Sequence, residues 1–297
     1  MSSAYVAIQQ QTYQMQPLWY ASFISPAVLC AVAILSIGVL AWVIVKVELQ
    51  SKKQTLSLTT VFTPANTLAF ILAFTSVIYY AAMSVSMYSG ATGQWSFTPV
   101  VITVSLGVLE TAYLWFAWIR ASDIIERQSS PLQNKIIKAL LYASCLNPAY
   151  GLLTICLPNS LGFLVHIPGG AITCILDVYF GLSFAKYIFR LQENLTDVGY
   201  KKFAETEQYM IISRHGLFMS SCALSSLACF VVGIICLEAN PTMETMISFN
   251  LFWMAKDFFL TTIGLCVLRM KMALINEKKV RKHGSSGKET TVVTNEA

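Results

Sequence analysis

The sequence predicts an all-α integral membrane protein, a bundle of seven transmembrane helices with its N-terminus outside and its C-terminus inside. The chain of 297 residues is 56% hydrophobic and 12% charged, with a mean hydropathy of +0.61. This composition is too apolar for a soluble domain of this size. Seven long apolar segments, and a regular alternation of basic connections between them, predict the number of helices and their direction.

Each apolar segment holds about 20 or more residues, the length that an α-helix needs to cross about 30 Å of hydrocarbon. In chain order the segments are 18–45, 66–90, 98–120, 136–158, 163–189, 214–237 and 244–270. Within span four, Pro148 is expected to kink the helix because proline leaves a backbone carbonyl without its partner. The longest charged connection, 191–213, is expected either to extend span five as a helix or to form a solvated charged linker.

The basic residues orient these spans. All of the 20 Lys and Arg residues except Lys256 lie in or at the edges of the connections after spans one, three and five, or follow span seven. The alternate connections contain Glu but no Lys or Arg, so the positive-inside rule places the N-terminus outside. The chain then divides into a short extracellular N-terminus (1–17), a transmembrane domain (18–270) and a cytoplasmic tail (271–297).

The tail begins with a basic cluster and continues with a Gly-Ser-Ser-Gly segment and polar residues. The cluster consists of Lys278, Lys279, Arg281 and Lys282. On the inner side these residues would meet the anionic leaflet, so the lipid bilayer is an expected partner. We therefore expect a multi-pass protein of the plasma membrane or an endomembrane.

Four strongly ionisable residues lie well inside the predicted spans: Glu110, Asp177, Lys256 and Asp257. A charge near the centre of a membrane helix costs at least about 2.5–3.5 kcal/mol. Counted from the outer ends of their helices, the first three lie at one depth, roughly 17–18 Å below the surface. We expect Glu110 and Asp177 to be the partners of Lys256, because adjacent helical residues such as Lys256 and Asp257 do not face each other.

Helical spacing extends this ionic site. Tyr113 falls on the Glu110 face of span three, and Trp253 falls on the Asp257 face of span seven, with Lys256 about 100° away. The candidate ligand-binding or intramembrane ionic site therefore consists of Glu110, Asp177, Lys256, Asp257, Tyr113 and Trp253. Two interpretations remain open. The charges either only hold the helices together, or they contact a ligand, relay ions or protons, or rearrange during activation.

Signals for an enzyme are missing from the sequence. It contains no HExxH, Walker A or GxSxG motif. The three histidines, His166, His215 and His283, are predicted at the outer edge, the inner edge and the tail, so they do not converge on one metal. We expect no catalytic residues, no metal site and no nucleic-acid partner.

The topology resembles that of G-protein-coupled receptors over the whole chain. This resemblance implies a receptor or signalling protein that transmits a ligand-biased helix rearrangement to a cytoplasmic partner such as a G protein. The local motifs differ from the receptor pattern. Span three ends in Trp-Ile-Arg120-Ala-Ser-Asp123 instead of an acid-Arg-aromatic triplet, and the Asn147-Pro-Ala-Tyr150 string lies on span four instead of span seven.

Two other hypotheses fit the same spans. A transporter or channel with two three-helix repeats joined by span four would use the intramembrane charges for an unknown solute. The pair of Lys256 and Glu110 also looks like the Schiff-base lysine and counterion of retinal proteins, which would make retinal on Lys256 a cofactor. Tyr113 and Trp253 would then line the chromophore pocket, although span six lacks a tryptophan.

Overall fold

The computed structural model describes residues 16–49, 57–92, 97–156, 166–194, 200–238 and 243–286. Within these ranges every regular element is a helix. The α-helices are α2 (Gln16–Trp42), α4 (Leu58–Val61), α5 (Pro64–Thr92), α6 (Thr98–Gln128), α7 (Pro131–Ala143), α8 (Asn147–Cys156), α10 (His166–Asn194), α11 (Tyr200–Glu238) and α12 (Met243–Ser286). A π-helical segment, Val43–Leu49, continues α2, and a 3-10 turn, Ser144–Leu146, joins α7 to α8.

Seven helical segments among the described residues are long and apolar enough to cross a membrane, which confirms the predicted all-α bundle and its seven spans. They are Tyr20–Lys46, Pro64–Ser89, Thr98–Gln128, Pro131–Leu153, Ile167–Leu191, Glu207–Cys236 and Ile247–Glu277. Span four begins at Pro131, earlier than predicted, because Ser130 and Gln133 form a capping box that starts the helix there.

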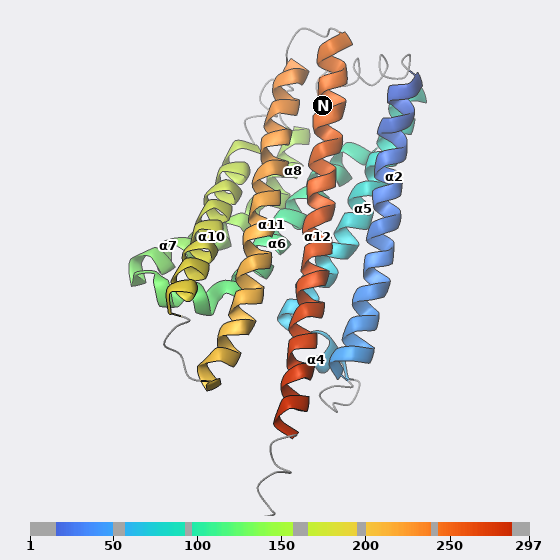
Figure 1. The fold of residues 1–297 in the computed structure, drawn as a ribbon. Coiled ribbons are helices and arrows are strands. Elements are labelled where there is room, and N and C mark those ends of the chain that lie inside the picture. Colours follow the sequence, from blue (N-terminus) through green and yellow to red (C-terminus); the bar gives the residue numbers. More distant parts are fainter. Residues whose placement is uncertain are drawn as a thin grey trace, which may run out of the picture.

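The helices form one closed bundle (Figure 1). Each spanning helix packs against the next in the sequence, and α12 closes the ring by packing against α2. Helix α6 is the most central helix, since it contacts α5, α7, α8, α10 and α11. Of the predicted charges, Glu110 lies on this central helix, and Lys256 and Asp257 lie on α12, which packs against α11, α2 and α5.

Span four is interrupted at the predicted proline. Helix α7 ends at Ala143, and α8 begins at Asn147, directly before Pro148. The proline has no N–H for the carbonyl of Ser144, and the hydroxyl of Thr111 on α6 donates to that carbonyl at 2.7 Å instead. The α-helix is thus interrupted at the predicted proline, and the Ser144 carbonyl, which also accepts from the N–H of Asn147, ties span four to span three.

The backbones of α6 and α8 touch where two glycines meet the facing helix. A Cβ added at Gly107 would lie 2.7 Å from the backbone of Asn147, and one at Gly151 would lie 2.9 Å from the backbone of Thr103. Small residues permit this closeness between membrane helices. The side chain of Asn147 is thereby brought into the centre of the bundle.

The helical extension in the 191–213 segment belongs mainly to span six. Helix α10 ends at Asn194 and α11 already begins at Tyr200. The prediction that this segment extends span five therefore holds only to Asn194. Helix α12 runs without a break from Met243 to Ser286 and so continues well past residue 270.

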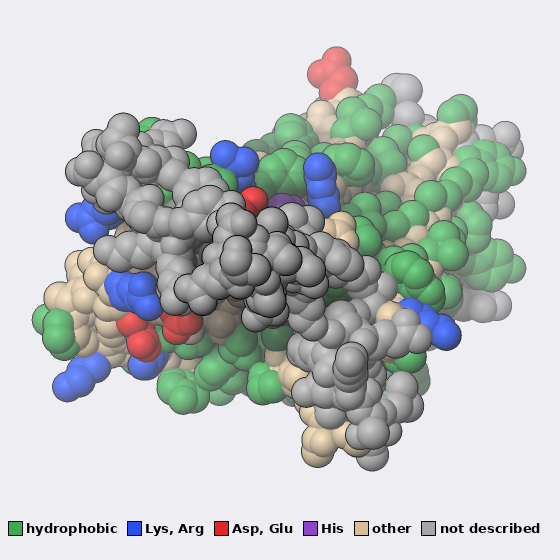
Figure 2. All heavy atoms as spheres, turned by 60° about the horizontal axis from the view of Figure 1, so that its bottom comes forward, with side chains coloured by type: hydrophobic (Ala, Val, Ile, Leu, Met, Phe, Trp, Pro, Cys, Tyr) green, Lys and Arg blue, Asp and Glu red, His purple; other side chains and the backbone are tan. Residues whose placement is uncertain are grey.

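Exposed basic side chains gather at one end of the bundle, which we call the basic end, where α2, α6, α10 and α12 finish (Figure 2). They are Lys46, Arg127, Lys135, Lys138, Lys186, Arg190, Arg214 and Arg269. The side chains of the predicted tail cluster, Lys278, Lys279, Arg281 and Lys282, lie outside the described residues, although their backbone belongs to α12.

Candidate functional site

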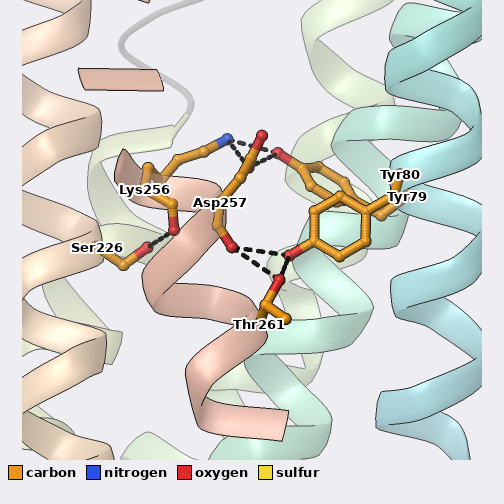
Figure 3. A network of polar contacts seen from close by, with 6 residues as sticks. All are labelled: Tyr79, Tyr80, Ser226, Lys256, Asp257 and Thr261. Atoms are coloured by element: carbon orange, nitrogen blue, oxygen red, sulfur yellow. Dashed lines mark hydrogen bonds and ion pairs between the residues drawn. The ribbon is translucent and has the colours of Figure 1, made fainter. Parts of the chain in front are cut away.

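Lys256 forms an ion pair with its neighbour Asp257 in the interior of the bundle. The two side chains lie on α12, with only 1% and 2% of each residue exposed, and Lys256 Nζ is 3.1 Å from Asp257 Oδ1. Tyr79 on α5 completes the group: its hydroxyl accepts from Lys256 Nζ at 2.5 Å and donates to Asp257 Oδ1 at 2.8 Å (Figure 3). We call Lys256, Asp257 and Tyr79 the lysine triad.

The triad corrects one prediction. Glu110 and Asp177 were expected to pair with Lys256 in preference to Asp257, but Lys256 has no ion pair with either within 4.0 Å, and Asp257 is its partner. Adjacent helical positions do point about 100° apart. The long, flexible stem of lysine spans that angle, and the Tyr79 hydroxyl lies where it bonds both charged groups.

A second set of hydrogen bonds joins α5 to α12 one turn further along. The Tyr80 hydroxyl donates to the backbone carbonyl of Asp257 at 2.9 Å and lies 2.7 Å from the Thr261 hydroxyl (Figure 3). The hydroxyl of Thr261 also donates to the same carbonyl at 3.0 Å. Consecutive tyrosines on α5 therefore hold both the side chain and the backbone of Asp257.

Aromatic rings cover the ammonium group of Lys256. Its Nζ lies 3.9 Å from the centre of the Trp253 ring and 5.1 Å from that of Tyr79. Such cation–π contacts are worth about 2 kcal/mol or more when they are desolvated. Phe249 and Phe230 pack against Trp253 in turn, with ring centres at 5.3 and 5.8 Å. The structure places Trp253 beside Lys256.

The two other predicted carboxylates are held by polar side chains instead of cations. Glu110 Oε2 accepts a hydrogen bond from Asn147 Nδ2 at 3.2 Å, and Asp177 Oδ1 accepts one from the Tyr113 hydroxyl at 2.7 Å. These bonds link α6 to α8 and α6 to α10. No ion pair to Glu110 or Asp177 occurs among the described residues within 4.0 Å.

A cavity of about 100 Å³ brings the two groups of contacts together. It lies between α5, α6, α8, α10, α11 and α12, and Glu110 and Lys256 both line it. Lys256 and Glu110 attract each other electrostatically, and Glu110 also interacts with Asp177. Of the three charges predicted to share one depth, Glu110 and Lys256 line this cavity, and Asp177 is not among its lining residues. The cavity wall includes three of the six predicted site residues: Glu110, Tyr113 and Lys256.

Several residues of the site were not predicted from the sequence. Tyr79 and Tyr80 hold the triad, and Ser226 on α11 donates to the backbone carbonyl of Lys256 at 3.3 Å. A tyrosine pair in the middle of span two is a polar signal in an apolar segment. This pair could have been predicted as part of a polar site, because tyrosine hydroxyls within the hydrocarbon region need hydrogen-bond partners.

A second buried lysine lies nearer the basic end. Lys271, predicted to lie in the tail, is only 5% exposed and donates to Asn66 Oδ1 on α5. Asn66 Nδ2 donates in turn to the carbonyl of Val61 at 2.8 Å. The contact fixes α12 to the start of α5, so α5 and α12 are joined by polar bonds at two depths.

Fold and site together define a seven-helix, multi-pass membrane protein with a buried ionic network around a central cavity. Comparison of the chain with protein-family models, with curated proteins and with solved structures gave no match.

Proposed function

We propose that this protein is a seven-transmembrane receptor or signalling protein in which a small ligand shifts the contacts between α12 and its neighbours. One observation carries the proposal. Lys256 and Glu110 line the same cavity, while the ammonium group of Lys256 is bonded to Asp257 and Tyr79. One cation thus faces two carboxylates on different helices, which is the requirement for a two-state contact.

The two arrangements would differ in which helices are joined. With Lys256 on Asp257, the triad holds α12 to α5 through Tyr79. With Lys256 on Glu110, α12 would be held to α6 across the cavity. A ligand with different affinities for these arrangements would shift their populations by that difference and by no more.

A cytoplasmic partner would detect the changed helix contacts at the basic end. By the positive-inside rule this end faces the cytoplasm, with the N-terminus outside. Its exposed Lys and Arg side chains and the long continuation of α12 offer a surface to a cytoplasmic partner such as a G protein (Figure 2). The tail cluster would rest on the anionic inner leaflet of the plasma membrane or an endomembrane.

The order of packing supports this proposal more than the transporter hypothesis. In the transporter hypothesis, span four only joins the two three-helix repeats. Here α8 packs closely on α6, and Asn147 contributes its side chain to the cavity wall and to Glu110. The closed ring from α2 to α12 gives no boundary between two repeats.

The size of the cavity does not favour the retinal hypothesis. An engineered cavity of about 150 Å³ admits benzene, so about 100 Å³ is far too small for a polyene of about 20 carbons. Reconstitution with retinal remains a direct test. A visible absorption band that disappears in Lys256→Ala would support an opsin and contradict the receptor proposal.

The proposed function is tested by guanine-nucleotide exchange on a panel of G proteins with the full-length protein in lipid nanodiscs. Asp257→Asn removes the carboxylate that holds Lys256, so we expect higher basal exchange than in the parent protein. Lys138→Gln, which changes a half-exposed residue at the basic end, is the control for altered surface charge. Exchange by neither protein with any G protein, together with solute flux in proteoliposomes that Glu110→Gln abolishes, would replace the receptor with a transporter.

A further inference from the structure

Of the charged residues that line the cavity, Glu110 has the fewest groups that compensate its charge. Asn147 Nδ2 donates to it at 3.2 Å, and no Lys or Arg in the described part of the chain lies within 4.0 Å of its carboxylate. Lys256 attracts it from across the cavity but is bonded to Asp257 at 3.1 Å. In a membrane interior a carboxylate in this position is costly unless a positive group joins it.

The amide oxygen of Asn147 is a second group in need of a donor. The residue is only 5% exposed, and its Oδ1 has no hydrogen-bond partner among the described residues. This oxygen lies beside Gly169 in the cavity wall, since a Cβ added at Gly169 would be 3.0 Å from it. An amide oxygen only accepts hydrogen bonds. A carboxylate and an amide oxygen on residues in contact with each other thus both lack N–H or O–H donors among the described residues, beyond the one bond from Asn147 Nδ2 to Glu110.

We propose that the cavity binds a small primary ammonium compound, with its charged nitrogen between the carboxylate of Glu110 and Oδ1 of Asn147. This inference rests on the proposed function, because the ammonium compound would be the ligand of that receptor. The ammonium group matches the site in charge and supplies three N–H donors. It would form a charge-assisted bond to Glu110 and a second bond to the unpartnered amide oxygen.

The space available limits the size of the compound. If about 150 Å³ admits the six heavy atoms of benzene, the cavity of about 100 Å³ admits about four. The ring of Tyr150 lies beside Gly169, since a Cβ added at Gly169 would be 3.4 Å from it. This ring offers an aromatic surface to the ammonium group. Because Gly169 has no side chain, the space beside Asn147 Oδ1 stays open for the ammonium group.

The charges of the cavity favour a cation over an anion. An anionic ligand would have to displace Asp257 and Tyr79 from Lys256 and would approach Glu110 against repulsion. An ammonium compound on Glu110 leaves the lysine triad intact and prevents Lys256 from crossing to Glu110. It therefore stabilises the arrangement in which α12 is joined to α5.

The test uses n-propylammonium chloride, which has four heavy atoms, and the purified full-length protein in lipid nanodiscs. The measurement is the midpoint of thermal unfolding as a function of ligand concentration. We expect a saturable rise with propylammonium and none with 1-propanol or with sodium chloride at equal ionic strength. Glu110→Gln removes the charge and should weaken binding at least about tenfold.

Two further variants keep the charge of Glu110 and test the rest of the site. Gly169→Ala fills the space beside Asn147 Oδ1 and should also weaken binding, which provides a second test if Glu110→Gln does not fold. Lys256→Met removes a like charge from the cavity and should strengthen binding. Weaker binding in Lys256→Met with no change in Glu110→Gln would place an anionic ligand on Lys256 and overturn the inference.

Other outcomes also decide the question. The inference fails if propylammonium gives no saturable stabilisation, or if sodium chloride stabilises the protein equally, which would identify an inorganic cation site. Binding of propylammonium, with no nucleotide exchange by the parent protein or by Asp257→Asn, would leave the ammonium site standing and remove the receptor role. Nucleotide exchange without ammonium binding would do the reverse.

Discussion

The lysine triad predicts a strong energetic coupling between two neighbouring residues of α12. At the observed separation of 3.1 Å, the attraction between Lys256 and Asp257 amounts to about 5 kcal/mol at an effective dielectric constant of about 20. The measured cost of removing one partner of a buried pair is about 3–5 kcal/mol. Because Asp257 would keep its bond from the Tyr79 hydroxyl, we expect Lys256→Met to cost about 3 kcal/mol, the lower end of that range.

A double-mutant cycle isolates the pair itself. Asp257→Asn combined with Lys256→Met removes the stranded carboxylate and keeps an acceptor for Tyr79, so the double variant should recover about 2 kcal/mol of the loss. The free energy of unfolding is measured by reversible SDS titration in mixed micelles. The parallel cycle of Lys256 with Glu110, which are further than 4.0 Å apart, should show a smaller coupling, since the same calculation gives less than about 4 kcal/mol beyond that distance.

The exposed pair of Lys138 and Glu126 is a matched control. Its charged atoms are 3.0 Å apart, almost the separation found in the triad, but its side chains are 49% and 46% exposed. Exposed pairs contribute about 0.2–1 kcal/mol. The argument from burial is refuted if the coupling of Lys256 with Asp257 does not exceed that of the exposed pair, or is smaller than its coupling with Glu110.

Three further outcomes follow from the contacts between helices. Tyr80→Phe removes two hydrogen bonds between α5 and α12 and should lower the free energy of unfolding by about 0.5–1.5 kcal/mol in the same SDS titration; no change would show that Thr261 alone satisfies the shared carbonyl. Gly107→Ala places a Cβ 2.7 Å from the backbone of α8 and should lower the free energy of unfolding by about 1–3 kcal/mol. Gly38→Ala, whose Cβ would have no atom within 4 Å, should be neutral or stabilising. Equal effects of the two variants would contradict the close approach of α6 and α8. Ser22→Ala removes the 2.9 Å bond between α2 and α12 and should cost about 0.6 kcal/mol, so a loss of more than about 1.7 kcal/mol would mean that the ring closure depends on more than this bond.

The sequence was sufficient for the spans and for the region in which the buried charges meet. Span length, the positions of Glu110 and Lys256 along their helices and the proline of span four are local properties of the chain, and the structure agrees with each. The partner of Lys256 was not a local property. It depends on Tyr79, which is distant in sequence, and on a lysine stem whose rotamer no periodicity determines.

The role of Asn147 was likewise inaccessible to the sequence alone. It reaches Glu110 because Gly107 lets α8 approach α6 to backbone contact and because the 3-10 turn before Pro148 sets the start of α8. Helix spacing predicts which residues share a face, but the distance between two faces depends on the smallest residues on both. A search for glycines opposite each other on spans three and four is the signal that would have pointed to this contact.

The two sides of the cavity differ in the kind of contact that holds them, and this difference indicates where movement is expected. Helices α6 and α8 meet through backbone atoms at Gly107 and Gly151, so sliding one along the other would bring main chains into collision. Helices α5 and α12 are joined instead by side-chain hydrogen bonds from Tyr79 and Tyr80, which exchange partners without moving the main chain far. Close-packed contacts resist gradual deformation, whereas polar contacts with two available partners have two discrete arrangements. We therefore expect a ligand at Glu110 to bind a fixed α6–α8 wall and to hold α12 in its contact with α5, whereas loss of the ligand would free α12, which continues to Ser286, to change partners.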